Sequence, residues 1–124
     1  MKIINSSKAP AAIGPYCHGI KVGHFIYTSG QLPVIPEKGV FAEGIQGQTE
    51  QSLKNVQAVL EAEGYSLSNV VKTTVFLSDM ANFGPMNEVY GRMFGNHKPA
   101  RSCFQVARLP KDALVEIEVV AYKE

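Results

Sequence analysis

The sequence predicts an α+β protein in which a single mixed β-sheet is covered on one face by two helices. Three observations predict this fold: two strand-like segments near the start, two helix-like segments separated by one strand-like segment, and two strand-like segments at the end. No repeat, low-complexity tract or linker divides the 124 residues. We therefore expect residues 1–124 to form one domain with its own core.

The first elements form a hairpin followed by a loop. The stretch "HGIKVGHFIYTSGQLP" predicts two strands around a turn at residues 22–24, and Gly30 and Pro33 end the second strand, which spans residues 24–29. The next stretch, "PVIPEKGVFAEGI", is rich in proline and glycine and predicts a loop with a short edge strand at residues 40–41.

Two helices are predicted from apolar residues that recur at helical spacing. The first covers residues 45–63 and ends before Gly64. Its apolar face consists of Leu53, Val56, Val59 and Leu60. The second begins after Asp79 or Asn82, either of which can cap it, and carries Pro85 in its tolerant first turn. Its apolar stripe consists of Phe83, Met86, Tyr90, Met93 and Phe94.

Three further strands are predicted at residues 70–77, 101–106 and 114–122. In the last strand, Val115, Ile117, Val119 and Ala121 point to one face of the sheet. The opposite face receives Leu114, Glu116, Glu118, Val120 and Tyr122. That second face is too apolar for bulk water and too charged for a core, so we expect it to meet another subunit of a homo-oligomer.

Composition limits the possible partners. Lysine and arginine number 12 against 11 acidic residues, so no basic field exists that would attract nucleic acid. The start "MKIINSSKAP" lacks the features of a signal peptide, and no apolar run approaches the roughly 18 residues that span a bilayer. Cys17 and Cys103 form no CxxC pair. We therefore expect a cytoplasmic protein with free thiols and no membrane partner.

Cofactor motifs are missing from the sequence. His18, His24 and His97 have none of the spacings typical of metal ligands, and "GQTEQS" lacks the glycines and the lysine of a phosphate-binding loop. We expect neither a metal nor a nucleotide cofactor.

Arg101, in "KPARSCFQVARLP", is the strongest candidate for chemistry. It either forms a structural ion pair with Glu116 or Glu118 on a neighbouring strand, or binds the carboxylate of a small acid through its paired donors. Arg92 and Arg108 are more typical of solvated surface.

Other candidates have two interpretations each. Tyr16, in "IGPYCHG", follows a stiff turn and either lines a pocket or packs. Ser29 and Gly30, in "TSGQLP", either let a ligand approach the backbone or form an ordinary turn. Cys103 fits plain packing at the start of a strand, since nothing in the sequence pairs it with a histidine base.

Several segments together resemble the RidA (YjgF) family of imine deaminases along essentially the whole chain. They are "APAAIGPY", "GHFIYTSGQLPV", "QTEQSLKNVQAVLEAEG", "VVKTTVFLSDMANFGPMNEVYGRMF" and "PARSCFQVARLPKDALVEIEVVA". The resemblance implies a chorismate-mutase-like fold and a homotrimer whose active sites lie in clefts between subunits.

The resemblance also implies an activity: hydrolysis of 2-imino acids or their enamines, such as 2-aminoacrylate, 2-iminobutanoate and 2-iminopropanoate, to 2-oxo acids and ammonia. This would protect pyridoxal-phosphate enzymes. By the same resemblance, Arg101 grips the substrate carboxylate with help from the Gly30 backbone, and Glu116 orients or activates water. The other implied substrate-binding positions are Tyr16, Ser29, Asn87 and Cys103.

Two alternatives stand beside the deaminase. The same cleft could serve a non-catalytic, regulatory module that binds a small carboxylate or docks on a partner protein. RNA cleavage has also been attached to family members, but the near-neutral charge argues against it. The sequence leaves open the preferred imine and the proton-transfer roles of Glu116, Tyr16 and Cys103, and Glu118 would replace Glu116 if the strand register were shifted.

Overall fold

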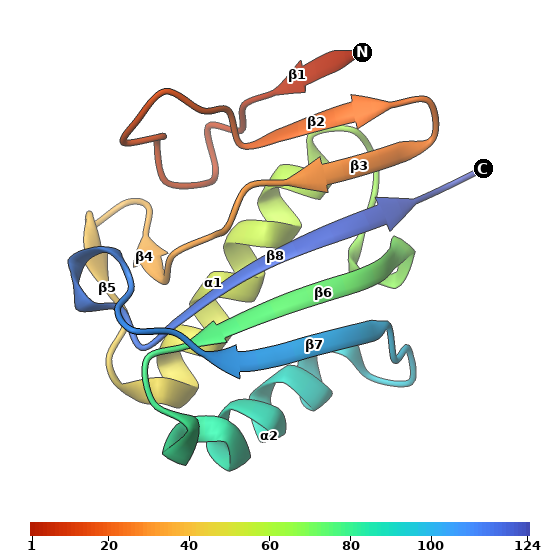
Figure 1. Ribbon diagram of the computed structural model, residues 1–124. Coiled ribbons are helices and arrows are strands. Elements are labelled where there is room, and N and C mark those ends of the chain that lie inside the picture. The colour runs from red at the N-terminus through yellow and green to blue at the C-terminus, as the bar shows by residue number, and fades with distance from the viewer.

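A six-stranded mixed sheet is the framework of the computed structural model, which describes residues 1–124. Its strands, in spatial order, are β1 (Lys2–Ile4), β2 (Gly19–Val22), β3 (Phe25–Thr28), β8 (Val115–Tyr122), β6 (Val70–Leu77) and β7 (Ala100–Gln105). Helices α1 (Gly44–Glu61) and α2 (Phe83–Phe94) both lie behind this sheet (Figure 1). The α+β fold with two helices on one face is therefore confirmed.

The final strand lies at the centre of the sheet. β8 pairs antiparallel with β3 and with β6, while β6 and β7 are parallel neighbours. A parallel pair needs a crossover connection, and α2 supplies it between these two strands. The predicted strand at residues 70–77 has the same bounds in the structure. β7 begins and ends one residue earlier than predicted, and β8 begins one residue later.

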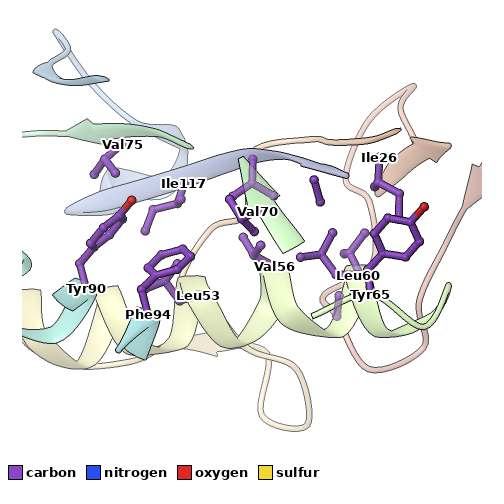
Figure 2. Packing of buried hydrophobic residues seen from close by; sticks show 14 of the residues in the cluster. Ile26, Leu53, Val56, Leu60, Tyr65, Val70, Val75, Tyr90, Phe94 and Ile117 are labelled. Atoms are coloured by element: carbon purple, nitrogen blue, oxygen red, sulfur yellow. The ribbon is translucent and has the colours of Figure 1, made fainter. Parts of the chain in front are cut away.

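The core lies between the sheet and the helices, as Figure 2 shows. The four residues of the predicted α1 face are completely buried: Leu53, Val56, Val59 and Leu60. They face β8, whose side chains alternate between buried and half-buried as predicted. No helix has the length and apolar character needed to cross a membrane.

The helix ends follow local chemistry. Gly64 has φ of 75°, a left-handed conformation that glycine adopts without strain, and the chain turns here soon after α1. The Asp79 carboxylate accepts a hydrogen bond from the Ala81 amide at 2.8 Å. It caps a short 3-10 turn, Met80–Asn82, and Asn82 makes no side-chain cap at the start of α2. Neither of the two proposed residues therefore caps α2 itself, and Asp79 instead caps the 3-10 turn that leads into this helix.

Two features differ from the sequence prediction. β1 was not predicted, because three residues are too few to display a strand period, and it exists by pairing with β2. The expected edge strand at residues 40–41 forms β5 (Val40–Phe41), but it pairs with β4 (Val34–Ile35) in a separate two-stranded sheet. The expectation of a single sheet was wrong in this detail.

Candidate active site

A pocket of about 520 Å³ opens where three separate loops meet at one end of the sheet. Figure 1 shows these segments gathered there: the loop after β1, the β4–β5 region and the turn that precedes β8. Four predicted site residues line this pocket: Tyr16, Ser29, Gly30 and Glu116, here called the Glu116 group. The fold thus unites candidates that are up to 100 positions apart (16 to 116) in the sequence.

Gly30 lies in direct contact with the carboxylate of Glu116. The neighbouring Gln31 donates its amide hydrogen to the Ile117 carbonyl at 2.8 Å and accepts one from the Ile117 amide at 3.3 Å. These bonds hold the segment after β3 against β8. A methyl group added to Gly30 would lie 2.8 Å from the Glu116 carboxyl carbon, so only glycine leaves this carboxylate where it is.

Two buried polar residues of α1 fix the same segment. Ser52 donates from Oγ to the Gln31 carbonyl at 2.7 Å. Asn55 donates from Nδ2 to the carbonyls of Leu32 and Val34, both at 2.9 Å. This function was not predicted, although a serine and an asparagine three positions apart beside the apolar stripe were a usable signal in the sequence.

The environment of Glu116 changes its acidity. Burial raises the pKa of its carboxyl group above the usual range, and the negative charge of Glu118 raises this pKa further. A carboxylate of this kind is a stronger base than an exposed one. Glu116 is therefore suited to accept a proton from water at the pocket.

The outer wall of the pocket is held by the loop that follows β1. The exposed Tyr16 accepts a hydrogen bond at its hydroxyl from the Ile13 amide at 3.3 Å. His18, which is buried, accepts from the Ser6 amide at Nδ1 (2.9 Å), so its Nε2 carries the hydrogen donated to the Pro10 carbonyl (2.7 Å). This anchoring role of His18 was not predicted from the sequence, where the residue was weighed only as a metal ligand.

A second set of candidates lies on β7 and α2. Asn87, Arg101 and Cys103 form what we call the Arg101 group. Arg101 donates from Nη1 to Oδ1 of Asn87 at 2.7 Å. Its guanidinium carbon lies 4.9 Å from the ring centre of Tyr90 and 5.4 Å from that of Phe83.

Cys103 is not an activated nucleophile. Burial raises the pKa of its thiol, while the charge of Arg101 acts in the opposite direction with a smaller effect. The side chain packs against the core as a small apolar residue. This agrees with the packing interpretation of Cys103.

The two groups lie on opposite faces of the sheet. Arg101 is in register with Thr73, which is buried on the helix-covered face, whereas Glu116 is in register with Phe76 on the open face. Glu118 shares the open face because its register partner is Thr74. Neither glutamate forms a salt bridge with Arg101 within the chain. The predicted alternative of a structural ion pair is therefore wrong.

The other two arginines, Arg92 and Arg108, lie at the surface. Arg108 is exposed and pairs with Asp112 at 2.8 Å, and Arg92 lies 3.9 Å from Glu50 at the surface. Both fit the surface role expected for them, since exposed ion pairs contribute little.

A family model described as Endoribonuclease L-PSP matches residues 6–123. A RutC family protein of Pyrococcus horikoshii is 52% identical over 124 residues, which cover 99% of this chain and 98% of the relative. The 2-iminobutanoate/2-iminopropanoate deaminase of Salmonella typhimurium is 48% identical over 125 residues, 98% of each chain.

The fold is shared with solved structures of similar length. The crystal structure of E. coli TdcF with bound serine has a TM-score of 0.96 and 46% identity, and the similarity covers 100% of both chains. Because the family model and these relatives match nearly the whole chain, the protein belongs to the Endoribonuclease L-PSP family, known also as the RidA (YjgF) family.

Proposed function

We propose that this protein hydrolyses reactive 2-imino acids and their enamines to 2-oxo acids and ammonia. One observation carries the proposal. The chain holds a fixed cation, Arg101, that can bind a carboxylate, and a basic side chain, Glu116, that can activate water. The two lie on opposite faces of the sheet and cannot meet within one chain. The near-full-length similarity to a relative named 2-iminobutanoate/2-iminopropanoate deaminase supports the same reaction.

The separation of the two groups leads to an assembly. We propose a homotrimer in which the Arg101 group of one subunit completes the Glu116 group of its neighbour, so that each cleft holds one site. The open sheet face supports this because it exposes Phe25, Tyr27 and Phe104, at 40%, 49% and 46% of their surface. Aromatic residues clustered on an uncovered face are typical of a surface that a second copy buries.

The chemistry follows from the charges of the two groups. The guanidinium of Arg101 pairs with the substrate carboxylate, which places the imine carbon near Glu116. Water then attacks this electrophilic carbon, its proton passes to Glu116, and the C=N electron pair moves to nitrogen. The protonated imine thus becomes a neutral carbinolamine, and Glu116 passes its proton to the amino nitrogen. The carbon–nitrogen bond then breaks, its electron pair leaves with ammonia, and the hydroxyl oxygen loses its proton to Glu116 as the carbonyl of the 2-oxo acid forms. No covalent enzyme intermediate is needed.

Small imino acids are the substrates we propose, including 2-aminoacrylate, 2-iminobutanoate and 2-iminopropanoate. Their removal would protect pyridoxal-phosphate enzymes in the cytoplasm. The polar ends of the proposed cleft fix a carboxylate and a water, while the pocket wall contributed by Ile13 and Leu32 offers apolar contact to a short side chain.

A second function is favoured by one observation. The similar structure of E. coli TdcF was solved with bound serine, an amino acid that carries the same carboxylate. A module that binds small carboxylates without turnover would use the same residues. Ribonuclease activity, the word in the family's description, has less support, because the net charge is +1 and no basic surface follows from the composition.

The deciding experiment generates imine in place. An amino-acid oxidase or threonine dehydratase supplies the imine, and keto-acid formation is followed with wild type, with Arg101→Ala and with Arg92→Ala as the matched control. Two charge-assisted hydrogen bonds are worth about 3–6 kcal/mol, so we expect Arg101→Ala to lower kcat/KM about 100-fold or more. Binding of 2-oxobutanoate without acceleration of imine loss would instead support the non-catalytic module.

A further inference from the structure

We propose that Phe83, Asn87 and Tyr90 of α2 are positioning residues that hold the guanidinium of Arg101 in one orientation and leave its Nε–Nη2 edge free to receive the carboxylate. This inference rests on the proposed function for the identity of the ligand. It assigns α2 a task beyond covering the sheet.

The three residues share one side of α2. Their spacing of four and three positions places them on successive turns of the same helical face. β7 carries Arg101 on the helix-covered side of the sheet, next to Thr73 of β6. Because β7 is the edge strand that follows α2, the arginine side chain lies along this helix face and remains half-buried.

The aromatic contact is rigid on the protein side. The Tyr90 ring, 7% exposed, is anchored by a hydrogen bond of 2.7 Å between its hydroxyl and Oγ1 of Thr73. Burial also raises the pKa of this phenol, so it stays neutral at physiological pH. Because the hydroxyl is bonded to Thr73, Tyr90 contacts Arg101 through its ring face, and the guanidinium carbon lies 4.9 Å from the ring centre.

The hydrogen bonding of the guanidinium gives its orientation. Nη1 donates to Oδ1 of Asn87, and no other protein atom accepts a hydrogen bond from this side chain. The edge formed by Nε and Nη2 therefore keeps both parallel donors, the pair that a carboxylate accepts side-on. An arginine already held by a ring face and an amide loses less side-chain entropy when the ligand binds.

The test compares variants of the full-length protein for Kd of 2-oxobutanoate, by calorimetry, and for KM and kcat of imine hydrolysis. Cation–π contacts are worth about 0.5–2 kcal/mol, so we expect Tyr90→Leu to raise Kd and KM roughly 2- to 30-fold with a smaller change in kcat. Tyr90→Phe keeps the ring and should rescue binding. Asn87→Ala, which removes only a half-buried amide, should weaken binding to a similar extent.

Tyr65→Leu is the matched control. Tyr65 is as buried as Tyr90, at 5% exposed, also has cations over its ring, and lies at the opposite end of the core in Figure 2. Both leucine variants should lose stability, but only Tyr90→Leu should lose affinity. If Tyr65→Leu and Tyr90→Leu reduce Tm by the same amount and both bind 2-oxobutanoate as wild type does, the positioning role is refuted. Should Tyr90→Leu fail to fold, Phe83→Leu and Asn87→Ala decide in the same way.

A nuclear magnetic resonance measurement separates this inference from the proposed function. The chain has three arginines, so the Nε–H signal of Arg101 can be assigned by its loss in Arg101→Lys. We expect a slowly exchanging, ordered signal in wild type and an averaged one in Tyr90→Leu and Asn87→Ala. Such a result without any imine turnover would uphold the positioning and reject the deaminase. If the Nε–H signal of Arg101 is equally ordered in wild type and in both variants, the positioning role is overturned, whatever the activity of the variants.

Discussion

Gly30 leaves room for the Glu116 carboxylate because its side chain is a single hydrogen atom. Its backbone is not in the left-handed region, so the conformation alone does not require glycine. The requirement comes from Glu116, because a Cβ would lie 2.9 Å from its Oε1 atom, inside contact distance. The glycine and the glutamate therefore act as a pair, although 86 positions (30 to 116) separate them in the sequence.

We expect Gly30→Ala to displace the Glu116 carboxylate and to lower kcat by about 10- to 100-fold, since small misplacements of a reacting group have effects of this size. The measurement is steady-state hydrolysis of imine generated in place. Gly91→Ala in α2, where a methyl group meets open space, is the control and should keep full activity while stabilising the fold by about 0.5–1 kcal/mol. Normal kcat in Gly30→Ala would argue against a role for Glu116.

The raised pKa of Glu116 predicts a pH dependence. If its carboxylate is the base, activity rises with pH through this pKa, so the acid limb should lie above the usual glutamate range of about 4.3. Replacing Glu118 with glutamine removes a like charge, lowers the Glu116 pKa and should move the acid limb to lower pH. The check is a kcat/KM profile of wild type and Glu118→Gln, and coincident profiles would contradict the assignment.

The raised pKa of Glu116 also makes the stability of the fold depend on pH. A carboxyl group whose pKa is higher in the folded than in the unfolded chain favours folding when protonated and opposes it when ionised. Its contribution is present below the unfolded pKa and is lost as pH rises through the folded pKa. Glu116→Gln should therefore gain stability relative to wild type as pH rises above the usual glutamate pKa of about 4.3.

At the scale of elements, α1 does more than supply an apolar face. Its buried Ser52 and Asn55 bind three carbonyl groups of the segment that follows β3, and this segment carries Gly30 to the pocket. The hydrogen bonds satisfy backbone groups that would otherwise be buried without partners. The helix is in this way a support for the site.

Asn55→Ala tests this support. It leaves the carbonyls of Leu32 and Val34 without their donor, and we expect a loss of about 1–3 kcal/mol in the free energy of unfolding, together with a higher KM from a loosened segment. Urea denaturation and steady-state kinetics measure the two effects. Gln57→Ala, on the solvent side of the same helix, is the control and should change neither by a comparable amount.

Elements were predictable from sequence where the pattern was long. The strand period repeats several times in β6 and β8, which have eight residues each, and the helical period repeats in the apolar stripe of α1. The positions of these elements were predicted well. β1 has only three residues, and β4 and β5 have two each, so none of them is long enough to display a strand period. The chemistry of Arg101 allowed its proposal as a carboxylate ligand, but its stacking on Tyr90 could not be predicted without the register of β7 against β6.

At the scale of the whole molecule, the sheet separates Arg101 from Glu116, the two residues that the proposed chemistry must bring together. Glu116 and Glu118 lie on the open face with the exposed aromatic residues, and Arg101 lies on the helix face. Alternation along β8 predicted that the open face would meet another subunit. It could not predict that the candidates would divide into two groups, because that depends on which strands are neighbours.

The proposed burial of the open face in a trimer predicts the effect of a charge placed there. We expect Tyr27→Glu to dissociate the assembly, since an ionised carboxylate would replace one of the exposed aromatic residues at the interface. Analytical ultracentrifugation reports the mass and the imine assay reports activity. A trimer with unchanged activity would show that this face is not the interface, and an active monomer would remove the need for shared sites.

The most direct test of the proposed intersubunit site is complementation between two variants that are each expected to be inactive. Arg101→Ala and Glu116→Gln are mixed in equal amounts, unfolded, refolded together, and compared with each variant refolded alone. If every site combines Arg101 of one subunit with Glu116 of the next, random assembly leaves about a quarter of the sites intact, so about a quarter of wild-type activity should return. Activity no greater than the sum of the two separate variants would contradict an active site formed between subunits.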